Sequence, residues 1–201
     1  LLSNFNTWSL AYSLAWAQGN SSYTVIQDET TNLREFPLDW DIRHNISANF
    51  TFRIARGEEF FIPFTNFILP LDDFSANINW AYASGAPYTP QSYESGQELD
   101  TNSKRMPSTQ QTNLRITKGF LLSNKINIKV FAEVENLFKN KNIISVYPKT
   151  GNYYWNGAQI EETNIPGFVY PEVYYVNSLA SKNPLNYNDF RGFTLGFSFN
   201  F

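Results

Sequence analysis

Residues 192–201 read GFTLGFSFNF, and every second residue of this stretch is large and apolar. In an extended strand successive side chains point to opposite faces, so the apolar residues would share one face. These residues are Phe193, Leu195, Phe197, Phe199 and Phe201. Small and polar residues occupy the alternate positions. The stretch therefore predicts a β-strand with one apolar face and one small, polar face.

The same alternation recurs along the chain, in segments close to the length of about 9–11 residues that a tilted membrane strand needs. We expect six strands, near residues 7–18, 45–55, 74–84, 112–122, 126–137 and 192–201. In a water-soluble protein the apolar faces would cover a core. In a transmembrane β-barrel they would face lipid, and the polar faces would line a lumen. We expect an all-β fold, an antiparallel portion of such a barrel.

The connections between the expected strands alternate in length, and this predicts their direction. Long segments follow the first, third and fifth strands, whereas only residues 123–125 separate the fourth from the fifth. The remaining connection, residues 56–73, is long for a turn. Bacterial barrels have long loops outside the cell and short turns in the periplasm. We therefore expect the long loops to be extracellular and the C-terminus to be periplasmic.

Composition excludes several other classes. No apolar run approaches the roughly 18–20 residues of a membrane-spanning helix, and the mean hydropathy is −0.37. A net charge of −3 argues against a nucleic-acid surface. With no cysteine and one histidine, His44, the chain lacks the usual partners for a nucleophile or a metal. We expect no enzyme activity, no catalytic residue, no cofactor and no metal site.

Five motifs occur in a specific order that ends on a terminal phenylalanine. They are PLDWDIRHNISANFTFRI (residues 37–54), SGAPYTP (84–90), RMPSTQQTNLRITKGF (105–120), NIKVFAEVENLFKNKNI (127–143) and RGFTLGFSFNF (191–201). Together they resemble the C-terminal end of the β-barrel of TonB-dependent outer-membrane receptors. The resemblance covers nearly the whole chain.

The resemblance implies a barrel of about 22 strands in the cell outer membrane, surrounded by lipid and filled by a plug. It implies active transport of a scarce solute, energised by TonB through an N-terminal region. The remaining barrel strands and the plug would then lie upstream of residue 1. The terminal strand, including Phe201, would be the signal read by the barrel-assembly machinery.

The loop in residues 139–191 is rich in aromatic residues that suit stacking on a sugar or a flat chelate. The same rings would equally suit packing of the loop on itself. The candidate ligand contacts are Tyr153, Tyr154, Trp155, Tyr170, Tyr174 and Tyr175. These residues name no particular solute.

Two side-chain expectations follow from strand parity. The charged residues on the polar parity, Arg53, Arg115, Lys129, Glu133 and Glu135, would form a wall of mixed sign. Lys118 falls on the apolar parity, so its long stem would reach lipid headgroups or a turn residue. We keep two alternative readings of the whole chain. One is a structural or adhesin barrel shared by several chains, and the other is a soluble, sugar-binding β-sandwich.

Overall fold

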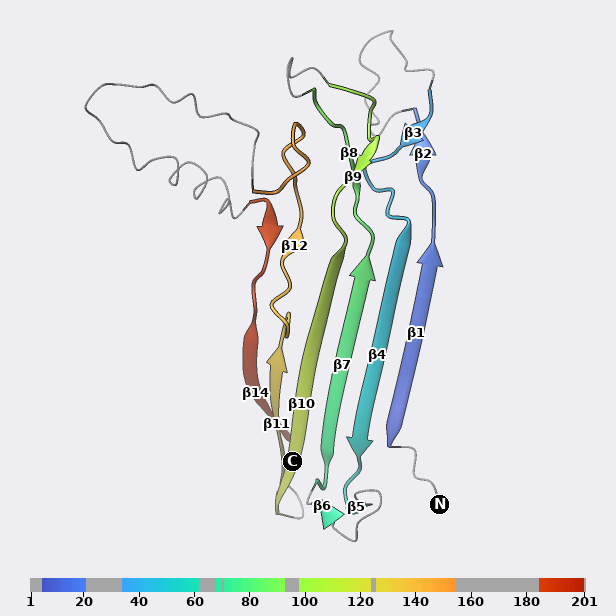
Figure 1. Cartoon of the computed structure of the whole chain (residues 1–201). Coiled ribbons are helices and arrows are strands. Elements are labelled where there is room, and N and C mark those ends of the chain that lie inside the picture. The colour runs from blue at the N-terminus through green and yellow to red at the C-terminus, as the bar shows by residue number, and fades with distance from the viewer. Residues whose placement is uncertain are drawn as a thin grey trace, which may run out of the picture.

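The computed structural model describes residues 5–20, 34–61, 68–69, 71–92, 98–123, 126–154 and 185–200. Six long strands form one antiparallel sheet in the order β1-β4-β7-β10-β11-β14 (Figure 1). Their bounds are β1 Asn6–Leu14, β4 His44–Ile54, β7 Phe74–Ala83, β10 Thr109–Ser123, β11 Ile126–Val134 and β14 Phe193–Asn200. The expected antiparallel, all-β arrangement of six strands is confirmed. Among these residues no helix is long and apolar enough to cross a membrane.

Short strand pairs lie beyond the two ends of this sheet (Figure 1). At the end we call the loop end are the pairs β2 (Gln18–Gly19) with β3 (Phe36–Pro37), β8 (Pro87–Tyr88) with β9 (Lys104–Arg105), and β12 (Asn142–Ile143) with β13 (Tyr187–Asn188). At the opposite end, the turn end, is β5 (Phe60–Phe61) with β6 (Ile68–Leu69). The three longest connections, residues 15–43, 84–108 and 135–192, therefore leave the loop end, and the shorter connection of residues 55–73 leaves the turn end.

The strand register aligns side chains of one kind across the full width of the sheet. One row is apolar and is formed by Trp8, Phe50, Ile78, Leu114, Val134 and Phe193. The next row points to the other side and is formed by Thr7, Thr51, Asn77, Arg115, Glu133 and Thr194. Because side chains alternate along each strand, the sheet has one apolar face and one polar face.

The apolar face is largely uncovered. Trp8 is 74% exposed and Leu195 is 81% exposed. Within the described residues, the only buried apolar side chains other than prolines are Ile54, Ile143 and Val146. The sheet is also open, because β1 and β14 each pair with one neighbour. A single-layer sheet of this kind has no ordinary core, so its apolar face needs cover from outside the described residues.

Two strands, β1 and β11, end three or more residues earlier than the sequence pattern predicts. β1 ends at Leu14, the Ala15 N–H still donates to the Arg43 oxygen (3.0 Å), and the Ala17 N–H then donates to the Asp41 side chain (2.9 Å). β11 ends at Val134, because Asn136 adopts a φ of 50° and its N–H donates to the Asn113 side chain (3.0 Å). In both places a side chain replaces a strand partner.

Candidate functional site

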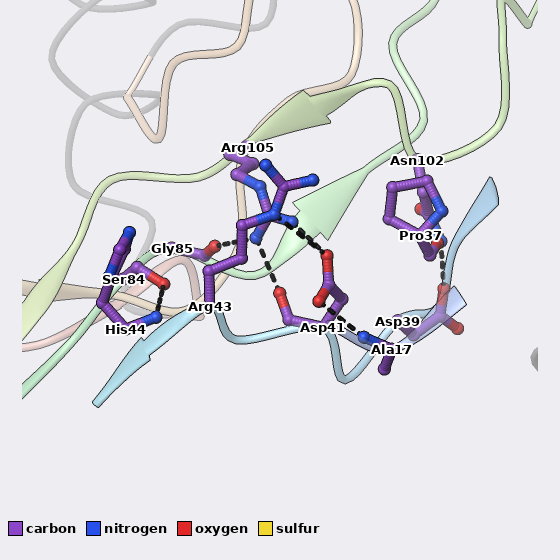
Figure 2. Close-up of polar contacts among 10 residues, drawn as sticks. All are labelled: Ala17, Pro37, Asp39, Asp41, Arg43, His44, Ser84, Gly85, Asn102 and Arg105. Atoms are coloured by element: carbon purple, nitrogen blue, oxygen red, sulfur yellow. Dashed lines mark hydrogen bonds and ion pairs between the residues drawn. The ribbon is translucent and has the colours of Figure 1, made fainter. Parts of the chain in front are cut away.

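An ion cluster around a buried carboxylate joins two connections at the loop end (Figure 2). The Asp41 side chain is 0% exposed and accepts a hydrogen bond from Arg105 Nη2. Arg105 Nη1 also donates to the backbone oxygens of Asp41 (2.6 Å) and Gly85 (3.1 Å). Arg43 Nε lies 3.6 Å from Asp41 Oδ2. We call Asp41, Arg43 and Arg105 the loop clamp.

Asp41 remains ionised in this cluster. Burial by itself raises the pKa of the carboxyl group, since a charge is poorly solvated there. The Ala17 N–H, the hydrogen bond and charge of Arg105, and the charge of Arg43 act in the opposite direction. They outweigh burial and hold the pKa of Asp41 below its usual range.

Asn102 also joins these two connections (Figure 2). Asn102, buried with a φ of 53°, donates from Nδ2 to Pro37 O (2.8 Å) and Asp39 Oδ1 (2.7 Å). Gly85 lies so close to the Met106 backbone that an added Cβ would overlap it. The SGAPYTP motif therefore needs its glycine because a second chain segment passes there.

The polar face carries an uncharged region within the sheet, where Asn49, Asn79 and Asn113 share one register row. Asn49 donates to Asn79, which donates to Asn77 (2.6 Å), which donates to Thr51 (2.7 Å). A shallow hollow of about 420 Å³ lies beside this amide chain. Its lining includes Ser9, Ser47, Asn49, Asn79, Gln111 and Asn113. Such a surface offers hydrogen bonds but no ionic attraction.

Nearer the turn end the polar face becomes charged. Arg115 Nη1 lies 3.1 Å from Glu133 Oε2, and its guanidinium lies 4.1 Å from the centre of the Phe131 ring. By register Arg53 and Lys129 share this face, because Arg53 is opposite Ser75 and Lys129 is opposite Gly119 and Ser198. Among the charged residues predicted to form a wall, Arg115 and Glu133 form an ion pair. Glu135 lies just past the end of β11, where its N–H donates to Gly192 O (2.9 Å).

Phe131 is the aromatic residue that the alternation places on the polar face. It lies opposite Gly196 of β14, and a Cβ on Gly196 would overlap the Phe131 ring. The Phe131 ring thus covers Gly196, and the Arg115 guanidinium packs on the same ring. This contact explains why one large aromatic residue breaks the polar pattern.

The candidate ligand contacts are only partly within the described residues. Tyr153 packs edge-on against Tyr154 and Tyr187, with ring centroids 5.1 and 5.8 Å apart. The Lys141 ammonium lies 4.1 Å from the Tyr187 ring centre and 5.2 Å from that of Tyr153. Tyr154 is 44% exposed. Trp155, Tyr170, Tyr174 and Tyr175 lie outside the described residues.

A buried asparagine of the fourth motif, Asn136, ties the start of this loop to the residues just before β14. Asn136 Nδ2 donates to Asn140 O (3.0 Å) and Phe190 O (3.2 Å), and Asn136 Oδ1 accepts from Asn140 N–H (2.9 Å). Because Asn136 is 3% exposed, its side chain is fully committed to these contacts. Asn136, in the sequence ENLF (residues 135–138), therefore joins the two ends of the connection between β11 and β14.

The predicted assembly-signal residues lie on the apolar face of the edge strand. Phe193, Leu195, Phe197 and Phe199 are all exposed, between 56% and 81%. Phe201 lies outside the described residues. On the same face, Lys118 Nζ donates to the backbone oxygen of Asp72, in the connection between β4 and β7. The prediction that Lys118 reaches a turn residue is confirmed.

His44 contacts an aromatic residue of the neighbouring strand. Its Nδ1 lies 3.0 Å from the Tyr12 hydroxyl, at the loop end of the apolar face. Among the residues with described positions, no three His, Cys, Asp or Glu side chains gather as metal ligands would. Searches against protein-family models, curated proteins and solved structures find no match to this chain. The function of this chain is therefore inferred from its own residues.

Proposed function

We propose that this chain forms part of the β-barrel of an outer-membrane receptor that takes up a scarce solute in a TonB-dependent manner. The observation that carries the proposal is the six-stranded sheet with an uncovered apolar face on one side and a hydroxyl, amide and charged face on the other. Lipid would cover the first face, and the second would line the lumen and contact a plug.

The two edge strands support a larger barrel. A strand edge exposes backbone N–H and C=O groups, and these must be paired where no water is present. The smallest single-chain barrels need about eight strands. In the proposal, upstream strands of the receptor pair with the free edges of β1 and β14 and close the barrel.

The connections support an orientation. Barrel loops are long outside the cell and short in the periplasm, so the loop end would be extracellular and β14 would run toward the periplasm. The loop clamp would then hold the bases of two extracellular loops. Tyr153 and Tyr154 belong to the third extracellular loop, between β11 and β14. We propose that aromatic rings of this loop contact the solute.

The proposal is tested on the full-length protein in its host cell. We expect it in the outer-membrane fraction, and we expect its purified form to bind the periplasmic domain of TonB. Absence from the outer membrane would reject the barrel. Outer-membrane location without TonB binding would instead favour a structural or adhesin barrel.

That second candidate draws on one specific observation, the two free edges of the sheet. Several copies could pair β1 of one chain with β14 of the next and so close a shared barrel. The mass of the detergent-solubilised protein separates the two candidates, because the mass of a shared barrel is a multiple of the mass of this chain. A sugar-binding β-sandwich would instead dissolve without detergent.

A further inference from the structure

The connection between β4 and β7, residues 55–73, has a polar base. Arg56 Nη2 lies 2.8 Å from Asp73 Oδ2, and the Gly57 N–H donates to Asp72 Oδ1 (2.6 Å). The Ala55 N–H donates to Glu58 Oε2 (2.9 Å), and Lys118 from β10 binds the Asp72 backbone oxygen. We call Arg56, Glu58, Asp72, Asp73 and Lys118 the collar.

Beyond the collar the connection becomes apolar. Residues 60–69 read FFIPFTNFIL, in which only Thr65 and Asn66 are polar. Phe60 and Ile68 belong to the short pair β5–β6, and Ile68 is 43% exposed. A connection that projects into water usually has its polar residues at the tip. Here only two of the ten residues are polar, and the charged residues lie at the base of the connection.

Phe60 packs against residues at the turn end of the sheet. Its ring lies edge-on to Phe52 (5.2 Å between centroids) and to Phe5 (5.4 Å). Phe52 also contacts Phe74 (6.3 Å) and belongs to the apolar face, two residues from Phe50. Exposure on this face falls from 41% at Phe50 to 1% at Ile54. The connection therefore continues the apolar face past the ends of the strands.

We propose that β5 and β6 insert into the phospholipid leaflet at the turn end, at the boundary between the headgroups and the acyl chains. This inference rests on the proposed function, since it assigns a membrane contact to one connection of the barrel. The charged collar would lie in the headgroup layer. Phe60 and Ile68 would dip back toward the acyl chains, next to the four-phenylalanine cluster of Phe5, Phe52, Phe60 and Phe74.

The physical reason for lipid as the partner is continuity. Phe60 joins the aromatic residues of the sheet's apolar face, so whatever covers that face extends onto the segment. Aromatic rings are favoured at the membrane boundary, and long cationic side chains reach out to headgroups from below it. Lys118, with its ammonium 5.9 Å from the Phe120 ring centre, has this arrangement.

The test places a nitroxide label on single cysteines, which is practical because this sequence contains no cysteine. The variants are Ile68→Cys in the segment, Glu58→Cys in the collar and Leu195→Cys on the apolar face. Both apolar sites are exposed, so labelling disturbs little packing. The full-length protein is reconstituted in phosphatidylethanolamine and phosphatidylglycerol vesicles. Collision rates with oxygen and with a water-soluble nickel complex are then measured for each label.

We expect the ratio of oxygen to nickel collisions at residue 68 to be close to that at residue 195 and well above that at residue 58. A ratio at 68 equal to that at 58, with 195 in lipid, would overturn the inference and leave the proposed barrel intact. Such a result would assign the segment to water or to a protein partner. A water-accessible label at 195 would instead overturn the proposed function, and the inference with it.

Discussion

Arg105 and Asp41, 64 residues apart in the sequence, are joined by a backbone contact of 2.6 Å and by a side-chain ion pair. Each residue belongs to a different long connection, one between β7 and β10 and one between β1 and β4. The pair therefore holds two loops together at their bases, where the sheet itself has ended.

Replacing Asp41 with Asn should open these loop bases. The change leaves two guanidinium groups without their carboxylate partner, and loss of a buried charged partner costs about 1–3 kcal/mol. Trypsin should then cleave after Arg43 and Arg105 roughly 5- to 150-fold faster, as mapped by mass spectrometry on the full-length protein. The control is Asp100→Asn, which changes an exposed carboxylate in the connection that carries Arg105. Equal cleavage of wild type and Asp41→Asn would contradict the clamp.

The clamp should also weaken in acid. Because the folded state lowers the pKa of Asp41, the carboxylate contributes its stability above the ordinary carboxyl pKa of about 3.9. That contribution is lost as the pH falls through the lower, folded pKa. Hydrogen exchange of the Ala17 amide, corrected for the intrinsic rate, should lose protection only below about pH 4. In Asp41→Asn the protection should not vary with pH in this range, and residues 44–54 serve as an internal reference.

Gly196→Ala should destabilise the wild type and stabilise a Phe131→Ala background. In the wild type the new methyl group overlaps the Phe131 ring, and such overpacking costs about 1–3 kcal/mol. Without the ring, alanine is better than glycine within a strand by roughly 0.5–1 kcal/mol. The denaturation midpoints of the full-length single and double variants measure this change of sign. Ser198→Ala, on the same face of β14, should behave alike in both backgrounds.

Deleting Phe201 should reduce membrane insertion of the full-length protein if the terminal strand is an assembly signal. Burial of one phenylalanine contributes only about 2–3 kcal/mol, too little to unfold a large barrel. A strong defect on outer-membrane fractionation would therefore indicate loss of recognition. The triple alanine variant of Tyr153, Tyr154 and Trp155 should insert normally. Normal insertion without Phe201 would reject the signal hypothesis.

Much of the sheet could be predicted from the sequence because strand parity is a local property. Each strand alternates with period two, so the faces of Leu195 and Thr194 follow from their positions alone. Lys118 could also be predicted to reach a turn, because a long stem on an apolar face has few other places for its charge. The aromatic loop of residues 139–191 was less predictable, since Tyr153 suits either a ligand or its actual neighbour Tyr187.

The sequence by itself determined which residues share a face, because neighbouring side chains in an extended chain must point in opposite directions. Only the tertiary structure decided the contacts between distant segments. Phe131 covers Gly196 because the register of β11 and β14 places them opposite each other. Asp41 meets Arg105, and Phe60 meets Phe52, because connections fold back beyond the strand ends. No local pattern encodes such contacts, since each depends on how two connections or two strands are placed in space.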